Sequence, residues 1–268
     1  MWYLLSIPVA LCALYVLATC CRKGHPGLEA LRGWRYAHRG LHSNGVPENS
    51  MAAFRKAVDN GYGIELDVHL LKDGSLAVLH DHSLKRTAGA DVSIEDLTAD
   101  DLKNYRLMGT EETIPLLSLV LELVGGRAPL IIELKSTTKN YAALCQATTR
   151  MLDSYDGIYC IESFDPRCIG WLKKHRRSLI RGQLAENFFR SGSSMAFALK
   201  LLMSWQLTHF LTLPDFVAFK YRDRKNLGTF LSRKLWGAQG VSWTLKTQEE
   251  LDIAEKEGWI PIFEGFTP

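Results

Sequence analysis

Short apolar runs alternate with amphipathic stretches from about residue 35 to the C-terminus. Apolar runs of four to eight residues are typical of buried strands, and apolar positions recurring every three or four residues are typical of helices. Eight strands are predicted in this region, beginning near residues 36, 64, 130, 158, 180, 216, 241 and 260. Helices are predicted between strands at residues 51–58, 91–105, 115–124, 141–152, 165–172 and 247–256. Eight alternating units of this kind predict an α/β fold, a TIM (β/α)8 barrel.

A further apolar run near residue 75 is predicted to form a hairpin with the second strand rather than a barrel strand. Lys72-Asp73-Gly74 is a turn signal. The strand before it, residues 64–70, alternates strictly between polar and apolar positions. One of its faces therefore carries Glu65, Asp67 and His69. This β-hairpin appendage would return His80 to the level of the carboxylates.

The N-terminal run WYLLSIPVALCALYVLATCC, residues 2–21, contains no charged residue. About 20 apolar residues in a helix span a hydrocarbon core of about 30 Å. We therefore expect one N-terminal transmembrane helix over residues 1–21, a linker over 22–34 and a barrel domain over 35–268. Arg22 and Lys23 follow the run directly, which favours a cytoplasmic barrel domain in a single-pass membrane protein.

Composition and charge argue against a disordered chain and against a nucleic-acid-binding protein. The 268 residues are 47% hydrophobic and 23% charged, with a formal net charge of +3. This is ordinary globular composition, and the charge is too small to indicate a nucleic-acid partner. The six cysteines show no CxxC spacing, so neither a cysteine zinc site nor a disulfide framework is indicated.

The connection at residues 187–214 is unusually apolar. A barrel helix with an apolar face is one interpretation. A lid that faces a membrane or a substrate is the other. The sequence leaves both open.

Carboxylates lie on the second and third predicted barrel strands, where side chains can point into the mouth of a barrel. The active site of such a barrel lies at the carboxyl ends of its strands. Glu65, Asp67 and Glu133 would converge there, which is costly unless a cation neutralises them. Ligands that are all oxygen favour one divalent cation, Mg²⁺ or Ca²⁺.

Two histidines and two cationic residues complete this group. His38 and His80 are candidates for general acid and base near neutral pH. Arg39 and Lys135 supply positive charge for an anionic substrate, and arginine can bind phosphate oxygens bidentately. Each residue alone has a structural explanation, such as a surface ion pair between Glu133 and Lys135. The combination predicts a site that cleaves phosphodiesters.

Eight short segments, covering almost everything after residue 35, carry a resemblance to a known family. They are His38-Arg39-Gly40, Pro47-Glu48-Asn49-Ser50, Glu65-Leu66-Asp67-Val68, Lys72-Asp73-Gly74, Val78-Leu79-His80-Asp81, Ile132-Glu133-Leu134-Lys135, Ser163-Phe164-Asp165-Pro166 and Trp243-Thr244. The chain resembles the glycerophosphodiester phosphodiesterases, TIM-barrel enzymes related in mechanism to phosphatidylinositol-specific phospholipases C. With its apolar N-terminus it resembles a membrane-anchored bacterial member.

The resemblance implies hydrolysis of glycerophosphodiesters to an alcohol and sn-glycerol 3-phosphate. A glycerol hydroxyl would attack phosphorus and expel the alcohol, and water would then open the cyclic phosphate. His38 and His80 would exchange acid and base roles between these steps. The implied metal ligands are Glu65, Asp67 and Glu133. The implied substrate-binding residues are Arg39, Lys135, Glu48, which orients the site, and Trp243.

Two alternatives stay open at this point. One is a lysophospholipase D-like or other glycerophospholipid phosphodiesterase acting at the membrane. The other is a non-catalytic phospholipid-binding barrel, whose expected mark is the loss of a histidine or metal carboxylate; none is missing.

The end of the chain departs from the family pattern. The family usually ends its last strand with an Asp-containing turn, whereas this chain has Glu264-Gly265-Phe266-Thr267-Pro268. We expect this difference to leave the metal and acid/base residues untouched.

Overall fold

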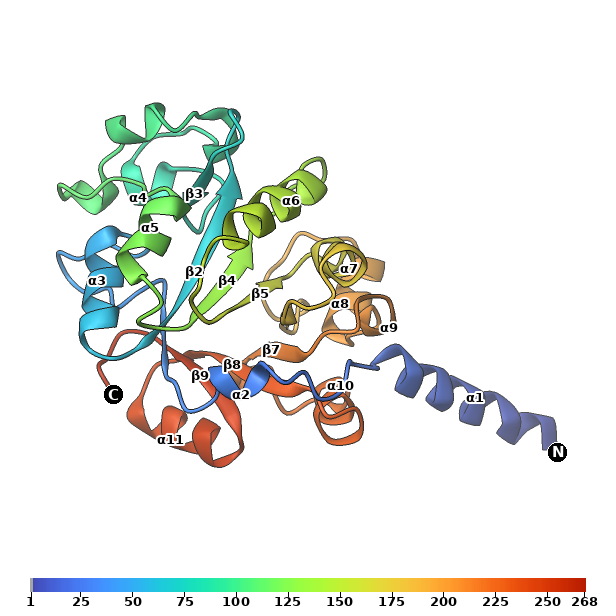
Figure 1. Ribbon diagram of the computed structural model, residues 1–268. Helices are drawn as coiled ribbons and strands as arrows, with labels where there is room; N and C mark the ends of the chain where they lie inside the picture. The colour runs from blue at the N-terminus through green and yellow to red at the C-terminus, as the bar shows by residue number, and fades with distance from the viewer. Residues whose placement is uncertain (1) are drawn as a thin grey trace.

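The computed structural model describes residues 2–268, and this part of the chain forms a barrel of eight parallel strands (Figure 1). The strands are β1 (Tyr36–His38), β2 (Gly63–Leu70), β4 (Leu130–Leu134), β5 (Tyr159–Ser163), β6 (Arg181–Ala185), β7 (Phe216–Lys220), β8 (Gln239–Leu245) and β9 (Trp259–Phe263). The barrel closes because β1 pairs in parallel with both β2 and β9. The predicted TIM barrel is confirmed.

Helices connect successive strands at most of the predicted places. They are α3 (Met51–Asp59), α5 (Leu117–Val124), α6 (Tyr141–Leu152), α7 (Pro166–His175), α8 (Phe197–Ser204), α9 (His209–Thr212), α10 (Leu227–Phe230) and α11 (Gln248–Lys256). The short elements η4 (Tyr221–Asp223) and η5 (Leu231–Leu235) flank α10. The side chains of Ser50, Asp165 and Thr247 accept backbone N–H groups at the starts of α3, α7 and α11. These caps explain why the three helices begin where they do.

The segment between β2 and α5 folds as a small unit with its own apolar core. β3 (Leu76–Val78) pairs antiparallel with β2, after a turn in which Gly74 has a φ of +86°. Short elements follow: α4 (Lys85–Ala88), η1 (Ile94–Asp96), η2 (Asp101–Asn104) and η3 (Leu107–Gly109). Their buried residues pack together with those of the hairpin: Leu71, Ala77, Leu79, Leu84, Ile94, Leu97, Leu102, Leu107 and Ile114.

The helix predicted over 91–105 is therefore wrong. The Asp101 carboxylate accepts both the backbone N–H and the hydroxyl of Thr98, which forms a local turn. Such side-chain bonds compete with helical hydrogen bonds.

The segment that was predicted as a linker, 22–34, packs on the barrel. It contains α2 (Leu28–Leu31), whose Leu28 and Leu31 are buried with Tyr36 in the apolar cluster that fills the barrel. Arg22 forms an ion pair with Asp215, at 2.5 Å, and donates from its backbone to the carbonyl of Pro214.

The N-terminal helix corrects the membrane prediction. Among residues 2–268, no helix is both long enough and apolar enough to cross a membrane. Helix α1 (Trp2–Ala18) has 17 residues and extends away from the barrel (Figure 1). At 1.5 Å per residue it is about 25 Å long, shorter than a hydrocarbon core of about 30 Å. The predicted single-pass membrane protein is wrong, and the cytoplasmic orientation that depended on it loses its basis. Met1 lies outside the described residues.

The membrane prediction fails because the last residues of the apolar run belong to the folded domain. Thr19 and Cys21 are buried, and the Thr19 carbonyl accepts from the hydroxyl of Ser232 at 3.2 Å. The Trp236 indole donates to the carbonyl of Val16 at 3.0 Å. The last residues of the predicted span are thus held by protein contacts.

The apolar connection at 187–214 forms α8 and α9, in the barrel position after β6. Within α8 only Met203 and Ser204 are buried. Packing on the barrel therefore does not account for the apolar composition of α8. Its exposed apolar side chains are Phe189, Phe197, Leu199, Leu201, Leu202, Trp205, Phe210 and Leu211.

Candidate active site

Three buried carboxylates meet where β2 and β4 end. In the parallel register Asp67 lies beside Glu133, and Glu65 is two residues before Asp67 on the same face. One oxygen from each of Glu65, Asp67 and Glu133 lies within 4.8 Å of the others. The structure thus brings the three predicted metal ligands together.

Two cations neutralise part of this charge. Lys135 Nζ lies 3.0 Å from Asp67 Oδ1 and 2.8 Å from Glu133 Oε1. Arg39 Nε lies 3.5 Å from Asp67 Oδ2, and its backbone N–H donates to Glu65 at 3.0 Å. Arg39 has a φ of +56°, in the left-handed region, so the chain turns sharply after β1 and points its backbone N–H at the cluster.

The three carboxylates have different pKa values because the neighbouring cations offset the effect of burial to different extents. Burial raises the pKa of Glu65 well above its usual value, and Asp67 and Glu133 raise it further. Burial likewise raises the pKa of Glu133 to about 7, although Lys135 opposes the shift. Burial also acts to raise the pKa of Asp67, but Lys135, His80 and Arg39 outweigh it and hold that pKa below its usual range.

A fourth carboxylate adds to the excess of negative charge. Glu162 on β5 lies beside Glu133 in the register, is buried, and has a pKa raised by burial and then by Glu133. Its Oε2 atom has no hydrogen-bond partner among the described residues. Four buried carboxylates against two cations fit a hard divalent cation such as Mg²⁺ or Ca²⁺ bound through Glu65, Asp67 and Glu133.

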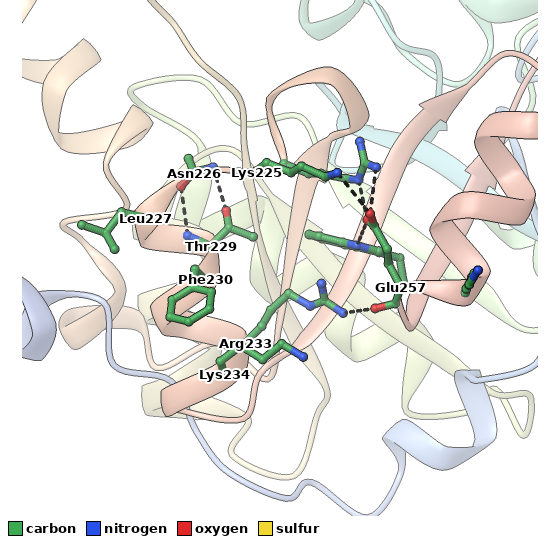
Figure 2. A pocket seen from close by; sticks show the side chains of 11 residues that line it. Lys225, Asn226, Leu227, Thr229, Phe230, Arg233, Lys234 and Glu257 are labelled. Atoms are coloured by element: carbon green, nitrogen blue, oxygen red, sulfur yellow. Dashed lines mark hydrogen bonds and ion pairs between the residues drawn. The ribbon is translucent and has the colours of Figure 1, made fainter.

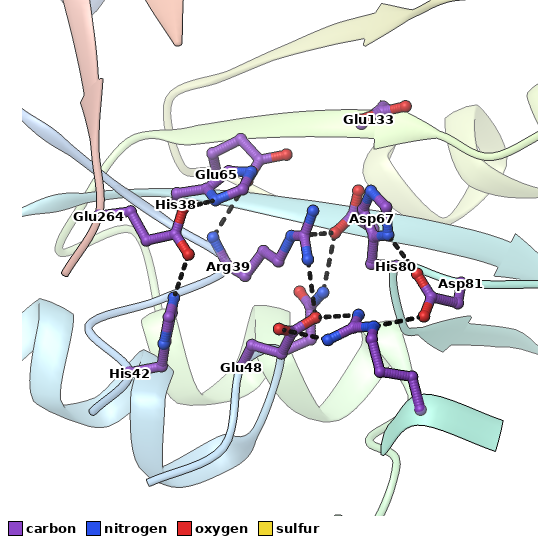
Figure 3. A network of polar contacts seen from close by, with 12 residues as sticks. His38, Arg39, His42, Glu48, Glu65, Asp67, His80, Asp81, Glu133 and Glu264 are labelled. Carbon is purple, nitrogen blue, oxygen red and sulfur yellow. Dashed lines mark hydrogen bonds and ion pairs between the residues drawn. The ribbon is translucent and has the colours of Figure 1, made fainter. Parts of the chain in front are cut away.

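Each histidine of the predicted acid/base pair has a carboxylate on its Nδ1 atom (Figure 3). His80 Nδ1 lies 2.5 Å from Asp81, and His38 Nδ1 lies 3.1 Å from Glu264. A carboxylate only accepts hydrogen bonds, so Nδ1 of each ring carries the proton. Both Nε2 atoms are left for proton transfer. His38 Nε2 faces Glu65 at 3.9 Å.

Burial lowers the pKa of both histidines, and that of His80 to about 4. Both rings are therefore neutral near neutral pH, and each can accept a proton at Nε2.

A chain of ion pairs connects the two halves of the site (Figure 3). Arg39 donates to Glu48 at 2.8 Å, and Arg86 donates to Glu48 at 2.6 and 2.9 Å. Arg86 also donates to Asp81 at 2.6 Å. Glu48 thus connects Arg39, through Arg86, to Asp81, the carboxylate that holds His80. These contacts support the predicted role of Glu48 in orienting the site.

Trp243 and Phe164 form an aromatic wall next to these groups. Their rings meet edge to face at 5.7 Å, and Lys220 lies over the Trp243 ring at 5.5 Å. The indole N–H of Trp243 is buried and has no partner within residues 2–268. It is available to donate to a substrate oxygen. A cavity of about 510 Å³ is lined by Trp243, Phe164, both histidines, Arg39, Lys135, Glu65, Glu133 and Glu162.

Sequence reasoning missed four residues of this site. Asn49 donates to Asp67 at 2.8 Å, Arg86 connects Asp81 to Glu48, and Glu162 is the fourth carboxylate. Glu264 is the most important, because the expectation that the altered C-terminal turn leaves the acid/base residues untouched is wrong. Glu264 contacts His38 and also pairs with Lys246. The departure from the family pattern was itself the available signal.

A separate hollow of about 570 Å³ lies at the amino end of β9 (Figure 2). In it Glu257 forms ion pairs with Arg224 at 2.9 Å and Lys225 at 3.4 Å, and Arg233 stacks on Trp259 at 3.9 Å. It contains neither predicted histidine nor any of the metal carboxylates.

Fold and site together define a TIM-barrel protein with two carboxylate-paired histidines beside a buried cluster of carboxylates. The sequence profile of the Glycerophosphoryl diester phosphodiesterase family matches residues 38–263. The chain belongs to this family, which confirms the resemblance drawn from its motifs.

Known proteins show how far the likeness extends. A glycerophosphodiester phosphodiesterase from Bacillus altitudinis is 41% identical over 130 residues, which are 45% of this chain and 52% of that protein. Lysophospholipase D GDPD1 from Rattus norvegicus is 34% identical over 132 residues, 44% of this chain and 40% of that protein. These matches span about half or less of the relatives' length.

A solved structure shares the fold across nearly the whole chain. It is a phosphodiesterase from Oleispira antarctica in complex with the product sn-glycerol-3-phosphate. The TM-score is 0.74 at 21% identity, covering 88% of this chain and 94% of that chain.

Proposed function

We propose that this chain hydrolyses glycerophosphodiesters to an alcohol and sn-glycerol 3-phosphate, with a divalent cation and with His38 and His80 as acid and base. The observation that carries the proposal is the pair of histidines, each held by a carboxylate on Nδ1, beside a cluster that combines carboxylates with Arg39 and Lys135. The fold family and the relatives named above support the same substrate class.

The reaction proceeds in two steps that use this chain's own groups. A free glycerol hydroxyl next to the phosphodiester gives its proton to Nε2 of one histidine and bonds to phosphorus. The bond from phosphorus to the alcohol breaks, and the other histidine, which has taken up a proton at Nε2 on binding the anionic diester, protonates the departing oxygen. Water then attacks the cyclic phosphate with the roles reversed, and the ring opens. Arg39 and Lys135 hold the phosphate oxygens.

The cation would be held by Glu65, Asp67 and Glu133. When bound, it neutralises the carboxylates and stabilises negative charge on the phosphoryl oxygens.

The substrate class can be tested with two diesters. With Mg²⁺ or Ca²⁺ present, glycerophosphocholine should be converted to choline and sn-glycerol 3-phosphate. Bis(p-nitrophenyl) phosphate should be cleaved at least about 100-fold more slowly, because it lacks the neighbouring hydroxyl whose attack is intramolecular. Enzymatic measurement of choline and glycerol 3-phosphate, with released nitrophenol as the comparison, gives both rates. Faster cleavage of the nitrophenyl diester contradicts the proposal.

A second candidate is hydrolysis of lysophospholipids, and an apolar groove favours it. A hollow of about 610 Å³ shares Glu133, Lys135 and Phe164 with the catalytic cavity. Its other apolar lining residues are Leu134, Pro166, Phe188, Met195, Leu199 and Met203. The last four belong to the apolar connection 187–214, so this groove is where a single acyl chain attached to the glycerol would find apolar surface.

The groove is tested by introducing a charge into it. Leu199→Asp should lower the hydrolysis of lysophosphatidylcholine by about tenfold or more, because a contact with several methylene groups at about 0.8 kcal/mol each is lost. The hydrolysis of glycerophosphocholine should change by less than about twofold. Leu119→Asp on α5 is the matched control, since Leu119 is similarly exposed and is not in the groove. Activity on glycerophosphocholine alone eliminates the lipid candidate.

A further inference from the structure

Three side chains outside the catalytic cluster converge on one point. His69 lies on β2, His82 follows catalytic His80 by two residues, and Glu95 lies in η1. His69 Nδ1 is 2.9 Å and His82 Nδ1 is 2.6 Å from the same oxygen, Oε1 of Glu95. The three ligand atoms all lie within 4.8 Å of one another. The three side chains are therefore close enough together to bind one metal ion.

The hydrogen-bond partners of His69 leave room for a cation. Its Nε2 lies 3.4 Å from the backbone carbonyl oxygen of His80, which only accepts. Without an ion, the N–H of His69 lies on Nδ1 and donates to Glu95 Oε1, as in the other histidine–carboxylate pairs of this chain. When an ion binds, the ring takes its other tautomer, in which Nε2–H donates to the His80 carbonyl. The Nδ1 lone pair and Glu95 Oε1 are then both free to bind the ion.

The surrounding contacts are those that a metal site uses to orient its ligands. A metal-binding histidine usually donates its other ring N–H to a carbonyl or carboxylate, and Nε2 of His69 lies 3.4 Å from such a carbonyl, that of His80. The second oxygen of Glu95 accepts from the hydroxyl of Ser93 at 2.7 Å. His69 is buried, whereas His82 is about half exposed, which gives an ion a path from solvent.

We propose that His69, His82 and Glu95 form a second metal site, for Zn²⁺ or a similar borderline ion. Two imidazole nitrogens and one carboxylate oxygen suit zinc, and the all-oxygen catalytic cluster suits Mg²⁺ or Ca²⁺. Three protein ligands leave a fourth position for water. The ion ties the hairpin to η1, and through His69 it fixes the backbone at His80. This is a positioning role, separate from the proposed hydrolysis.

Zinc binding is measured on the full chain with the catalytic cluster saturated by Mg²⁺. Isothermal titration with Zn²⁺ should show one equivalent in the unmodified protein. His82→Ala should weaken this binding by more than 100-fold, because it removes one of the three ligands. The fold should persist, because His82 is half exposed and not part of the core. Exposed His175→Ala on α7 is the matched control and should bind as the unmodified protein does. Equal zinc binding by the His82→Ala variant overturns the proposal.

Two further measurements separate a metal site from a hydrogen-bonded His–Glu–His cluster. Ser93→Ala should weaken zinc binding by about 10–100-fold, the usual loss when a partner that orients a ligand is removed. Zn²⁺ should raise the Tm of the unmodified protein and leave that of His82→Ala unchanged. No zinc-dependent shift in the unmodified protein means that the cluster is held by hydrogen bonds alone, and the site is rejected. Neither readout depends on phosphodiesterase activity.

Discussion

Replacing His80 or His38 with alanine is expected to lower kcat for glycerophosphocholine by about 10²–10⁴-fold, the usual contribution of a positioned general acid or base. Both residues lie at strand ends, with Nδ1 held by Asp81 or Glu264 and Nε2 left for the substrate. The fold should persist, because each side chain lies at the mouth of the barrel and not in its apolar cluster. Steady-state kinetics and thermal denaturation of the same samples test both statements.

The hydrogen bond between His80 and Asp81 allows a second, more specific test. Asp81→Asn keeps the size of the side chain but removes its charge, so kcat should fall by less than in His80→Ala. His175→Ala again serves as the control, because this exposed histidine stacks only on Trp171. Near-normal kcat in either His38→Ala or His80→Ala refutes the acid/base assignment.

The barrel and most of its site could be predicted because both depend on local patterns. Each strand is a short apolar run, and the carboxyl ends of parallel strands meet at one mouth. Residues as distant as His38 and Glu133 could therefore be placed together from sequence position alone.

The residues that were missed act through side-chain pairs that no local pattern shows. Glu264 reaches His38 only because β9 pairs with β1 when the barrel closes, 226 residues apart in the chain. Arg86 reaches Glu48 from α4, a short helix after β3 that was not predicted. A periodic pattern identifies which face is buried but not which partner a polar side chain meets.

The membrane prediction failed for a related reason. The hydropathy of residues 2–21 gives the length of the apolar run but not the residue at which its helix ends. Contacts from Ser232 and Trp236, over 200 residues away in the chain, hold the end of the run in the folded domain. Because of these tertiary contacts, α1 ends at Ala18, before the end of the apolar run.

Removal of the divalent cation is expected to reduce turnover of glycerophosphocholine by at least about 100-fold. A metal ion on a phosphoryl oxygen contributes several kcal/mol to the transition state, and 1.36 kcal/mol corresponds to a tenfold change in rate. Treatment with EDTA, followed by gel filtration and assay with and without added Mg²⁺ or Ca²⁺, measures this loss and its recovery. Activity that is insensitive to chelation contradicts the assignment of Glu65, Asp67 and Glu133 as ligands.

Stability gives an independent measure of the same site. Burial raises the pKa values of Glu65, Glu133 and Glu162, and the neighbouring cations Lys135 and Arg39 do not offset it. A cation at 100 times its Kd should therefore stabilise the native state by about 2.7 kcal/mol. The triple variant Glu65→Gln, Asp67→Asn and Glu133→Gln should lose this stabilisation, and His82→Ala should keep it. A Mg²⁺-dependent rise in Tm that survives the triple substitution would place the cation elsewhere.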